Sequence, residues 1–321
     1  MKLCIRFDVY GFLALQSDMM PTRYECGEKN LAYEQMPSQN SICVHNYQVI
    51  DRQSTFMAEV LFLGTGNAFS PPGRLHALVL IDGNILIDAP PTVLPQLRNF
   101  NIHPSSIKHL LFTHWHADHI FGFPFLMLER EWMPYDLGDK EPLNIYSRPN
   151  GKKILSDICK IGFPGSLDKT LVTGSRWSNS ESRNLYNTDW KFHRFPVCHT
   201  PETEPHGYEL IHSSGFTILH CGDSGPFHTI EERAPNADVI ILEMGIPDFV
   251  KSPYHHTPSD IISFSNRHPH VKVLVTHNFA KAPNQEHGFD VPELPEHIHQ
   301  LDDGDILNIL EDKSFLVQKR C

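Results

Sequence analysis

The chain has 321 residues, 40% of them hydrophobic and 20% charged, so it can bury the core of one large domain or two small ones. Twenty-seven Lys and Arg against 38 Asp and Glu leave a formal net charge of −11, which argues against long-range attraction to nucleic acid or to an anionic membrane. The seven cysteines are far apart and form no C-x-x-C pair, which disfavours a disulfide scaffold or a zinc ribbon and favours a reducing compartment.

Residues 1–56 differ in pattern from the rest of the chain. They are rich in polar and turn-forming residues and show no sustained period of 2 or 3.6, so we predict a weakly ordered extension. Met57 stands directly before an apolar run and is a candidate for the true start; the alternative is that residues 1–56 form a small appendage or a dimerisation arm. The leading residues carry no small-residue cleavage site and no run approaches 18 apolar residues, so we predict a cytoplasmic protein.

From Met57 onward, short apolar or β-branched runs alternate with candidate helices. The helices are predicted over residues 91–100, 121–132, 151–160 and 259–267. The predicted strands lie in the runs "HALVLID", "NILIDAP", "IKHLLFTH", "LNIYS", "WKFHRFPV", "FTILHCGD", "DVIILEMG", "VKVLVTH" and "DILNIL". This order predicts one α/β domain over residues 57–321, with two sheets that are each covered by helices on one face.

Several of these runs end in a residue that can bind a metal ion. The segment "LLFTHWHADHIFG", residues 110–122, passes from a buried strand directly into three histidines and an aspartate. Polar side chains gathered just past the end of a strand can turn toward one cavity at the rim of a sheet. Three later runs each close on one ligand-type residue, which brings the set to seven: His114, His116, Asp118, His119, His199, Asp223 and His277. Two divalent cations that share a carboxylate need about this many protein ligands.

The H-x-H-x-D-H motif, followed by His, Asp and His at later strand ends, resembles the metallo-β-lactamase superfamily from about Ala58 to the carboxyl terminus. The resemblance implies a four-layer αββα sandwich with the site at the common edge of the sheets. It further implies that His114, His116 and His199 hold one metal, that Asp118, His119 and His277 hold the other, and that Asp223 bridges them. Asp88 in "NILIDAP" matches an earlier aspartate that in relatives supports the metal site without binding the metal.

A site of this composition suits hydrolysis. Two divalent cations, with zinc expected and Mn²⁺ or Fe²⁺ as alternatives, lower the pKa of a bridging water so that hydroxide is available near pH 7. They also neutralise charge that develops on the substrate. Asp118 can steer or deprotonate that water as well as bind metal. A closed structural zinc site would use Cys-rich ligands and far fewer groups.

Two shorter features resemble the tRNase Z and phosphodiesterase branch of the superfamily. The glycine loop in "FLGTGNAFSPPGR" ends at Arg74, where an arginine is usual in that branch, although a tight turn explains the loop equally well. By this resemblance Arg74 is expected to support the metal site or to contact the substrate. In "YHHTPSD", His255 and Thr257 match an H-x-T element whose histidine is thought to protonate the leaving oxygen. His256 remains an alternative for that role. The resemblance implies that Thr257 supports the metal site or contacts the substrate, and helix entry is the alternative for Thr257.

The predicted substrate is a small phosphodiester or nucleotide. Relatives that process tRNA carry an extra arm between the third-motif histidine and the bridging aspartate, but here His199 and Asp223 are 223 − 199 = 24 residues apart. Together with the net charge of −11, this spacing argues against a structured tRNA as partner. A lactone, thioester or other carboxyl ester hydrolase is the main alternative. A tRNA 3′-processing endonuclease and an inactive binding homologue are weaker ones, and a homodimer stays open.

Overall fold

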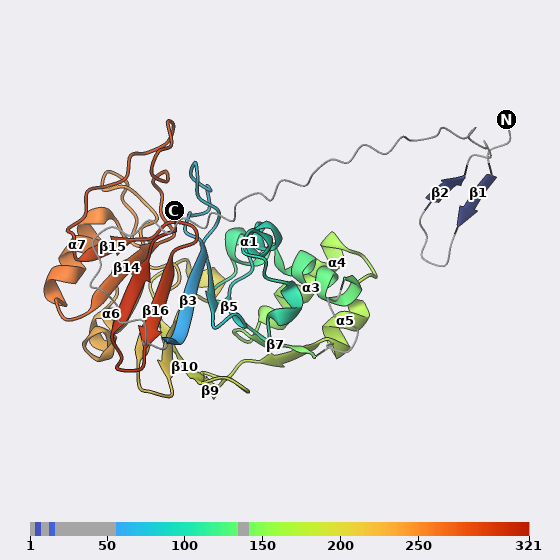
Figure 1. Cartoon of the computed structure of the whole chain (residues 1–321), viewed down its shortest axis with the longest axis horizontal. Coiled ribbons are helices and arrows are strands. Elements are labelled where there is room, and N and C mark those ends of the chain that lie inside the picture. Colours follow the sequence, from blue (N-terminus) through green and yellow to red (C-terminus); the bar gives the residue numbers. More distant parts are fainter. Residues whose placement is uncertain (1–3, 8–12, 17–55, 134–140, 321) are drawn as a thin grey trace, which may run out of the picture. The chain divides into compact units, whose positions relative to one another are not determined.

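The computed structural model describes residues 4–7, 13–16, 56–133 and 141–320 (Figure 1). The amino-terminal unit, residues 1–41, contains two described strands, β1 (Cys4–Phe7) and β2 (Leu13–Gln16), which pair antiparallel. The rest of the predicted extension up to residue 55 lies outside the described residues. In the second unit, residues 42–321, β3 begins at Phe56, one residue before the predicted domain boundary.

The first sheet of the second unit has eight strands, and its four strands from β5 to β8 run parallel. The other pairings are antiparallel. In spatial order the strands are β17 (Phe315–Gln318), β16 (Ile306–Leu310), β3 (Phe56–Gly64), β4 (Leu78–Ile81), β5 (Ile85–Ile87), β6 (His109–Leu111), β7 (Leu143–Tyr146) and β8 (Ser175–Ser178).

The second sheet has seven strands, and its four strands from β12 to β15 run parallel. In spatial order they are β15 (Ile298–Gln300), β14 (Lys272–Thr276), β13 (Val239–Glu243), β12 (Thr217–His220), β11 (His206–His212), β10 (Trp190–Pro196) and β9 (Ser182–Asn184). In this unit, the predicted runs did not include β15 or β17. They also did not include β8, β9 or β11. The first two are short and polar, and β11 carries histidines at both ends, so none of them reads as an apolar run.

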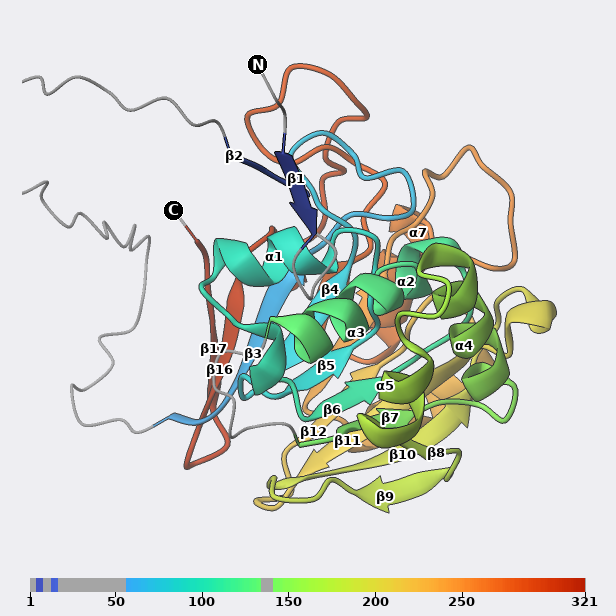
Figure 2. The same cartoon turned by 90° about the vertical axis from the view of Figure 1, so that its right-hand side faces the viewer.

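Helices cover the outer face of each sheet (Figures 1 and 2). One set packs on the first sheet: α1 (Val93–Asn99), α3 (Phe123–Trp132), α4 (Gly151–Gly162) and α5 (Asp168–Thr173). The other sheet is covered by α6 (His228–Arg233) and α7 (Pro258–Arg267). A third apolar cluster, which includes Phe62, Phe192 and Ile241, fills the space between the sheets. The predicted four-layer αββα sandwich is therefore confirmed. The short elements are α2 (Ala117–Ile120), η1 (Pro104–Ser106), η2 (Pro201–Thr203) and η3 (Ala234–Asn236).

The parallel strands explain why the ligand-type residues meet. Carboxyl ends of neighbouring parallel strands lie at the same edge of a sheet, and loops at that edge carry binding residues. In the first sheet, β5 leads into Asp88 and β6 leads into His114. In the second sheet, β12 leads into Asp223, β13 ends at Glu243 and β14 leads into His277.

A chain that begins at Met57 is expected to fold with a melting temperature within a few degrees of that of the full chain. Among the described residues, the three apolar clusters draw their members from Met57 onward. Of the strand pairings that the described residues of this unit form, the shortened chain would lose that of the exposed Phe56 with Leu310 at the end of β3. Thermal unfolding followed by circular dichroism checks this, and aggregation of the shortened chain would show that the segment covers apolar surface.

Within the part of the chain that the structure describes, no helix has both the length and the apolar character needed to cross a membrane.

Candidate metal centre

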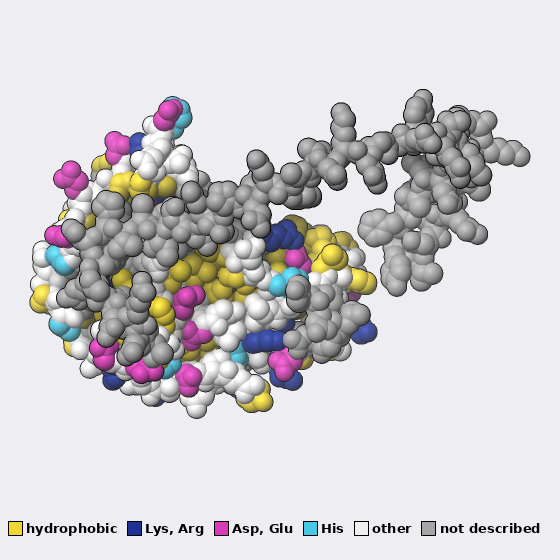
Figure 3. Space-filling model, in the orientation of Figure 1, with side chains coloured by type: hydrophobic (Ala, Val, Ile, Leu, Met, Phe, Trp, Pro, Cys, Tyr) yellow, Lys and Arg dark blue, Asp and Glu magenta, His cyan; other side chains and the backbone are white. Residues whose placement is uncertain are grey.

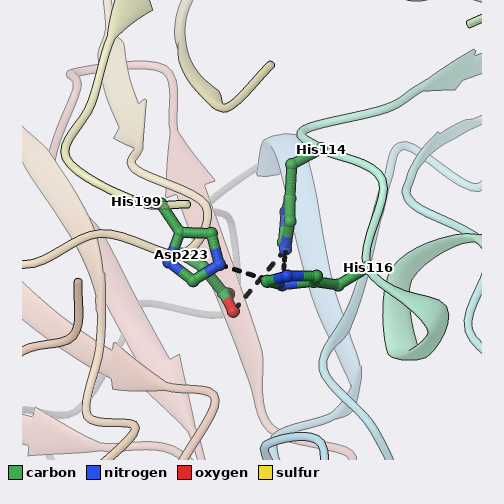
Figure 4. Close-up of side chains that lie close together, drawn as sticks. All are labelled: His114, His116, His199 and Asp223. Atoms are coloured by element: carbon green, nitrogen blue, oxygen red, sulfur yellow. Dashed lines mark hydrogen bonds and ion pairs between the residues drawn. The ribbon is translucent and has the colours of Figure 1, made fainter. Parts of the chain in front are cut away.

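The first group of ligand atoms comes from three histidines and one aspartate whose side chains converge (Figure 4). His116 Nδ1 lies 3.1 Å from His114 Nε2 and 2.9 Å from His199 Nε2. His114 Nε2 is 3.8 Å from an Asp223 carboxylate oxygen. All four ligand atoms lie within 4.8 Å of one another, which suits a single cation between them.

Hydrogen bonds on the outer side of the His199 and His114 rings leave the unprotonated Nε2 atoms directed toward the ligand group. His199 Nδ1 donates to the backbone carbonyl of Tyr254 at 3.0 Å, so its Nε2 is unprotonated in the neutral ring. The Thr113 hydroxyl donates to Asp88 at 2.7 Å and is therefore free to accept from His114 Nδ1 at 3.1 Å. His116 Nδ1 carries at most one proton, so it cannot donate a full hydrogen bond to both His114 Nε2 and His199 Nε2. A cation would satisfy all three nitrogens.

The second group contains Asp118, His119 and His277 and shares Asp223 with the first. His277 Nε2 lies 3.3 Å from an oxygen of Asp118 and 3.3 Å from an oxygen of Asp223. His119 Nε2 lies 3.3 and 3.4 Å from the same two carboxylates, is buried, and has no hydrogen-bond partner among the described residues. On the opposite edge of that ring, Nδ1 lies 2.8 Å from a carboxylate oxygen of Asp88, which fixes the orientation of the ring. Because Asp223 belongs to both groups, it lies where a ligand that bridges two metal ions would lie.

The electrostatics of the second group favour a positive charge. Burial lowers the pKa of His119, but the carboxylates of Asp223, Asp118 and Asp88 outweigh burial and hold that pKa well above 6.5. Burial raises the pKa of Asp118, yet His119 and His277 bring it well below its usual range, so the carboxylate stays ionised. A divalent cation would supply the positive charge that this concentration of carboxylates attracts. The residues present therefore fit two metal ions.

The backbone is strained at two points of the site. Asp88 and His277 adopt positive φ angles of 69° and 46°, which non-glycine residues rarely do and which cost about 1–3 kcal/mol each. Each residue directly follows its strand, so the left-handed step redirects its side chain toward the shared edge. Such strain is typical of functional positions that the surrounding structure holds in place.

His255 faces the ligand groups and is paired with a buried acid. Its ring lies 4.9 Å from the ring of His199 and stacks at 6.3 Å on that of His277. Its Nδ1 donates to Glu243 at 2.7 Å. Burial lowers the pKa of His255, but the hydrogen bond to Glu243 and the charge of that group outweigh burial and raise the pKa to about 9. Glu243 was not predicted from the sequence, although it ends the strand in "DVIILEMG" just as a His or an Asp follows the strand in several other runs.

The two neighbours of His255 have other partners. His256 is buried and its Nδ1 donates to the backbone carbonyl of Ser224 at 2.6 Å. Thr257 is the N-cap of α7 and forms a capping box with Asp260, so its hydroxyl is engaged in helix entry. Of the three residues, the structure brings His255 to the ligands, whereas the substrate role considered for Thr257 has no support from its contacts.

Arg74 is held inside the protein rather than at the site. Its side chain is 1% exposed and forms an ion pair with Asp302 at 2.9 Å. Its guanidinium also donates to Thr65 Oγ1 and to the carbonyls of Ala280 and Leu301. All of these acceptors are intramolecular, so Arg74 fastens the glycine loop to the carboxyl-terminal segment. Of the two roles expected for Arg74, support of the site or contact with the substrate, the buried position excludes contact with the substrate.

The model of the "Beta-lactamase superfamily domain" matches residues 83–278, which is more than half of the chain. The chain belongs to the beta-lactamase superfamily. The metallo-β-lactamase fold protein YhfI from Bacillus subtilis superposes with a TM-score of 0.61 at 14% identity, covering 78% of this chain and 99% of that one. A diphosphatase of the PhnP family superposes with a TM-score of 0.57 at 23% identity over 78% and 97% of the two chains. Both likenesses show the fold of this superfamily member.

A sequence relative among curated proteins is a ribonuclease Z from Methanococcus maripaludis, 28% identical over 145 residues. The alignment covers 44% of this chain and 46% of that protein, so the chain spans about half the length of the curated relative that it matches. Similarity to it is therefore similarity to part of a ribonuclease Z.

Proposed function

We propose that this superfamily member is a dinuclear metal-dependent hydrolase that acts on a small phosphodiester. The observation that carries the proposal is the pair of ligand groups that share Asp223, with the hydrogen-bonded His255–Glu243 pair beside them. The ligands would be His114, His116 and His199 for one ion and Asp118, His119 and His277 for the other, with Asp223 common to both. Divalent ions held there would make hydroxide available near neutral pH and offset negative charge on the substrate.

The side chains around the ions have separable tasks in this proposal. Asp118 is the most open carboxylate of the second group, with 11% of its side chain exposed against 4% for Asp223, so it can steer or deprotonate the attacking water. Glu243 orients His255 and stabilises its protonated form. His255 can then donate a proton to the departing oxygen, and bound cations would bring its pKa down toward the operating pH.

The size of the expected substrate follows from the length of the segment between two ligand residues and from the charge of the chain. The 23 residues between His199 and Asp223 include η2, β11 and β12, and the short connections that remain leave no length for an arm that could grip a folded RNA. The chain has a formal net charge of −11, and Lys and Arg side chains are scattered on the part of the face in Figure 3 that is not drawn in grey. Phosphate contacts from Lys and Arg dominate nucleic-acid affinity, so a small phosphodiester is favoured over a polyanion.

A second candidate is cleavage of RNA. The Methanococcus maripaludis relative is named ribonuclease Z, while the structural neighbour of the PhnP family is named a diphosphatase. Both names concern bonds to phosphorus, which supports phosphoryl chemistry over ester hydrolysis at carbon. The same metal pair would nevertheless serve a lactone or thioester, so the reaction class needs a direct test.

The test compares hydrolysis rates on bis(4-nitrophenyl) phosphate, a simple lactone and an unprocessed tRNA, with metal-depleted protein as control. We expect turnover of the phosphodiester that is abolished by chelation and restored by zinc, and little cleavage of the tRNA. A lactone turned over about a hundredfold faster would overturn the phosphodiesterase proposal. Efficient tRNA cleavage would overturn the small-substrate part of it.

A further inference from the structure

A small cavity lies between the two sheets, next to the proposed metal centre. The volume open to the centre of a water molecule is ≈ 20 Å³. Apolar side chains of β4 and β5 form one wall, and polar residues from both sheets form the rest. The lining consists of Ala77, Leu78, Val79, Ile87, Asp88, His119, His220, Gly222, Asp223, Thr276 and His277.

Strand alternation explains how polar side chains come to face this space. Leu274 of β14 and Ile218 of β12 belong to the apolar cluster between the sheets. Side chains two residues apart on a strand point to the same face, so Thr276 and His220 also point between the sheets. The apolar core is thus bordered by the Thr276 hydroxyl and the His220 imidazole, just before the loops that carry His277 and Asp223.

Apart from His119 Nε2, which faces the carboxylates of the metal centre, two buried polar atoms of the lining residues have no hydrogen-bond partner among the described residues. They are Thr276 Oγ1 and His277 Nδ1. The other ring nitrogen of His277 faces the carboxylates of Asp118 and Asp223, so Nδ1 lies on the side of the ring away from the metal centre. Buried polar atoms are nearly always satisfied, by protein or by ordered water, because leaving them unpaired is destabilising.

A third polar atom is available from His220. Its Nδ1 accepts a hydrogen bond from the backbone N–H of Gly222 at 3.2 Å. In the neutral ring the proton is then on Nε2, which leaves that nitrogen as a donor. The cavity therefore combines a volume of about one water, for which roughly 10–15 Å³ suffices, with about the three polar partners that a buried water typically has.

We propose that this cavity binds one water molecule, which accepts a hydrogen bond from His277 Nδ1 and is held by Thr276 Oγ1 and His220. The water fixes the tautomer of His277 with the proton on Nδ1, so that the lone pair of Nε2 would be available to a bound metal ion. The inference rests on the assignment of His277 as a metal ligand in the proposed function. Thr276 and His220 are then positioning residues that act through the water, as partners behind a metal-bound histidine commonly do.

The direct test is a high-resolution crystal structure of the wild-type protein, which should show one ordered water within hydrogen-bond distance of His277 Nδ1 and Thr276 Oγ1. The second measurement is zinc affinity, determined by chelator competition, for Thr276→Val and Thr276→Ser. We expect Thr276→Val to weaken the binding of one of the two ions by about 10-fold to 100-fold. Thr276→Ser retains the hydroxyl and should bind both ions nearly as the wild type does.

The matched control is Thr217→Val, which removes a buried threonine hydroxyl from β12 outside the cavity lining and should leave both affinities unchanged. A wild-type structure with no water in the cavity overturns the proposal, as do unchanged affinities in Thr276→Val. His277→Ala separates the two levels of inference. If that variant keeps both ions, the assignment of His277 as a ligand is wrong. If it loses one ion, the crystal structure and the zinc affinities decide whether the proposed water is present, independently of which substrate the protein hydrolyses.

Discussion

Replacing Asp223 with alanine is expected to release at least one of the two divalent ions and to remove nearly all hydrolytic activity. Asp223 is the only member common to both ligand groups, and its carboxylate oxygens lie 3.3–3.8 Å from nitrogens of His114, His119 and His277. Metal ions supply several kcal/mol of transition-state stabilisation, which corresponds to a loss of about 10³-fold or more. Elemental analysis of the purified variant and kcat/KM on a phosphodiester measure the two effects.

Asp238→Ala is the control for this variant. Asp238 precedes β13 and accepts a hydrogen bond from the backbone N–H of Thr217 at 2.7 Å, so its removal perturbs the same sheet without touching the ligand groups. Its metal content should equal that of the wild type. Full metal occupancy in Asp223→Ala would contradict the bridging assignment, provided that circular dichroism shows a folded protein.

Replacing His255 with alanine is expected to slow hydrolysis of an alkyl or nucleoside phosphodiester by about 10²-fold to 10⁴-fold, the usual contribution of a positioned acid. An alkoxide leaving group has a high pKa and needs a proton in the transition state, whereas a nitrophenolate does not. The loss on a nitrophenyl phosphodiester should therefore be much smaller. Metal content should be unchanged, since the proposed ligands remain. Initial rates on the two substrates, measured side by side, give the ratio.

His256→Ala is the matched comparison, because His256 adjoins His255 but is bonded to the backbone of Ser224. Any loss in that variant should be the same for both substrates. Glu243→Gln should shift the ratio in the direction of His255→Ala, but less, because the amide can still accept the Nδ1–H bond without stabilising the charged ring. Equal losses on both substrates for His255→Ala would point to binding or folding in place of proton donation.

Several features could be predicted from the sequence because their signals are local. Each apolar run that closes on a His or Asp is a strand followed by a ligand-type residue, and parallel strands bring such ends together regardless of the loops between them. The structure accordingly collects all seven predicted ligands in two groups that share Asp223. The two-sheet architecture follows from the same runs, with α1, α3, α4 and α7 close to their predicted ranges.

The roles of side chains around the ligands were decided only by the tertiary structure. Arg74 bonds the carbonyl of Leu301, 227 residues away, so no local pattern could show that it is an internal anchor. Thr257 was an open choice between substrate contact and helix entry, and its capping box with Asp260 decided for the helix.

The sequence by itself determined the superfamily, the layered fold and the identities of the ligand-type residues, since these depend on residue types at the ends of strands. The tertiary structure decided the hydrogen bond of Glu243 to His255, the partners that set the histidine tautomers, and the cavity behind His277. The physical reason is that the direction of a buried side chain is set by its partners, and here those partners lie on other strands and loops.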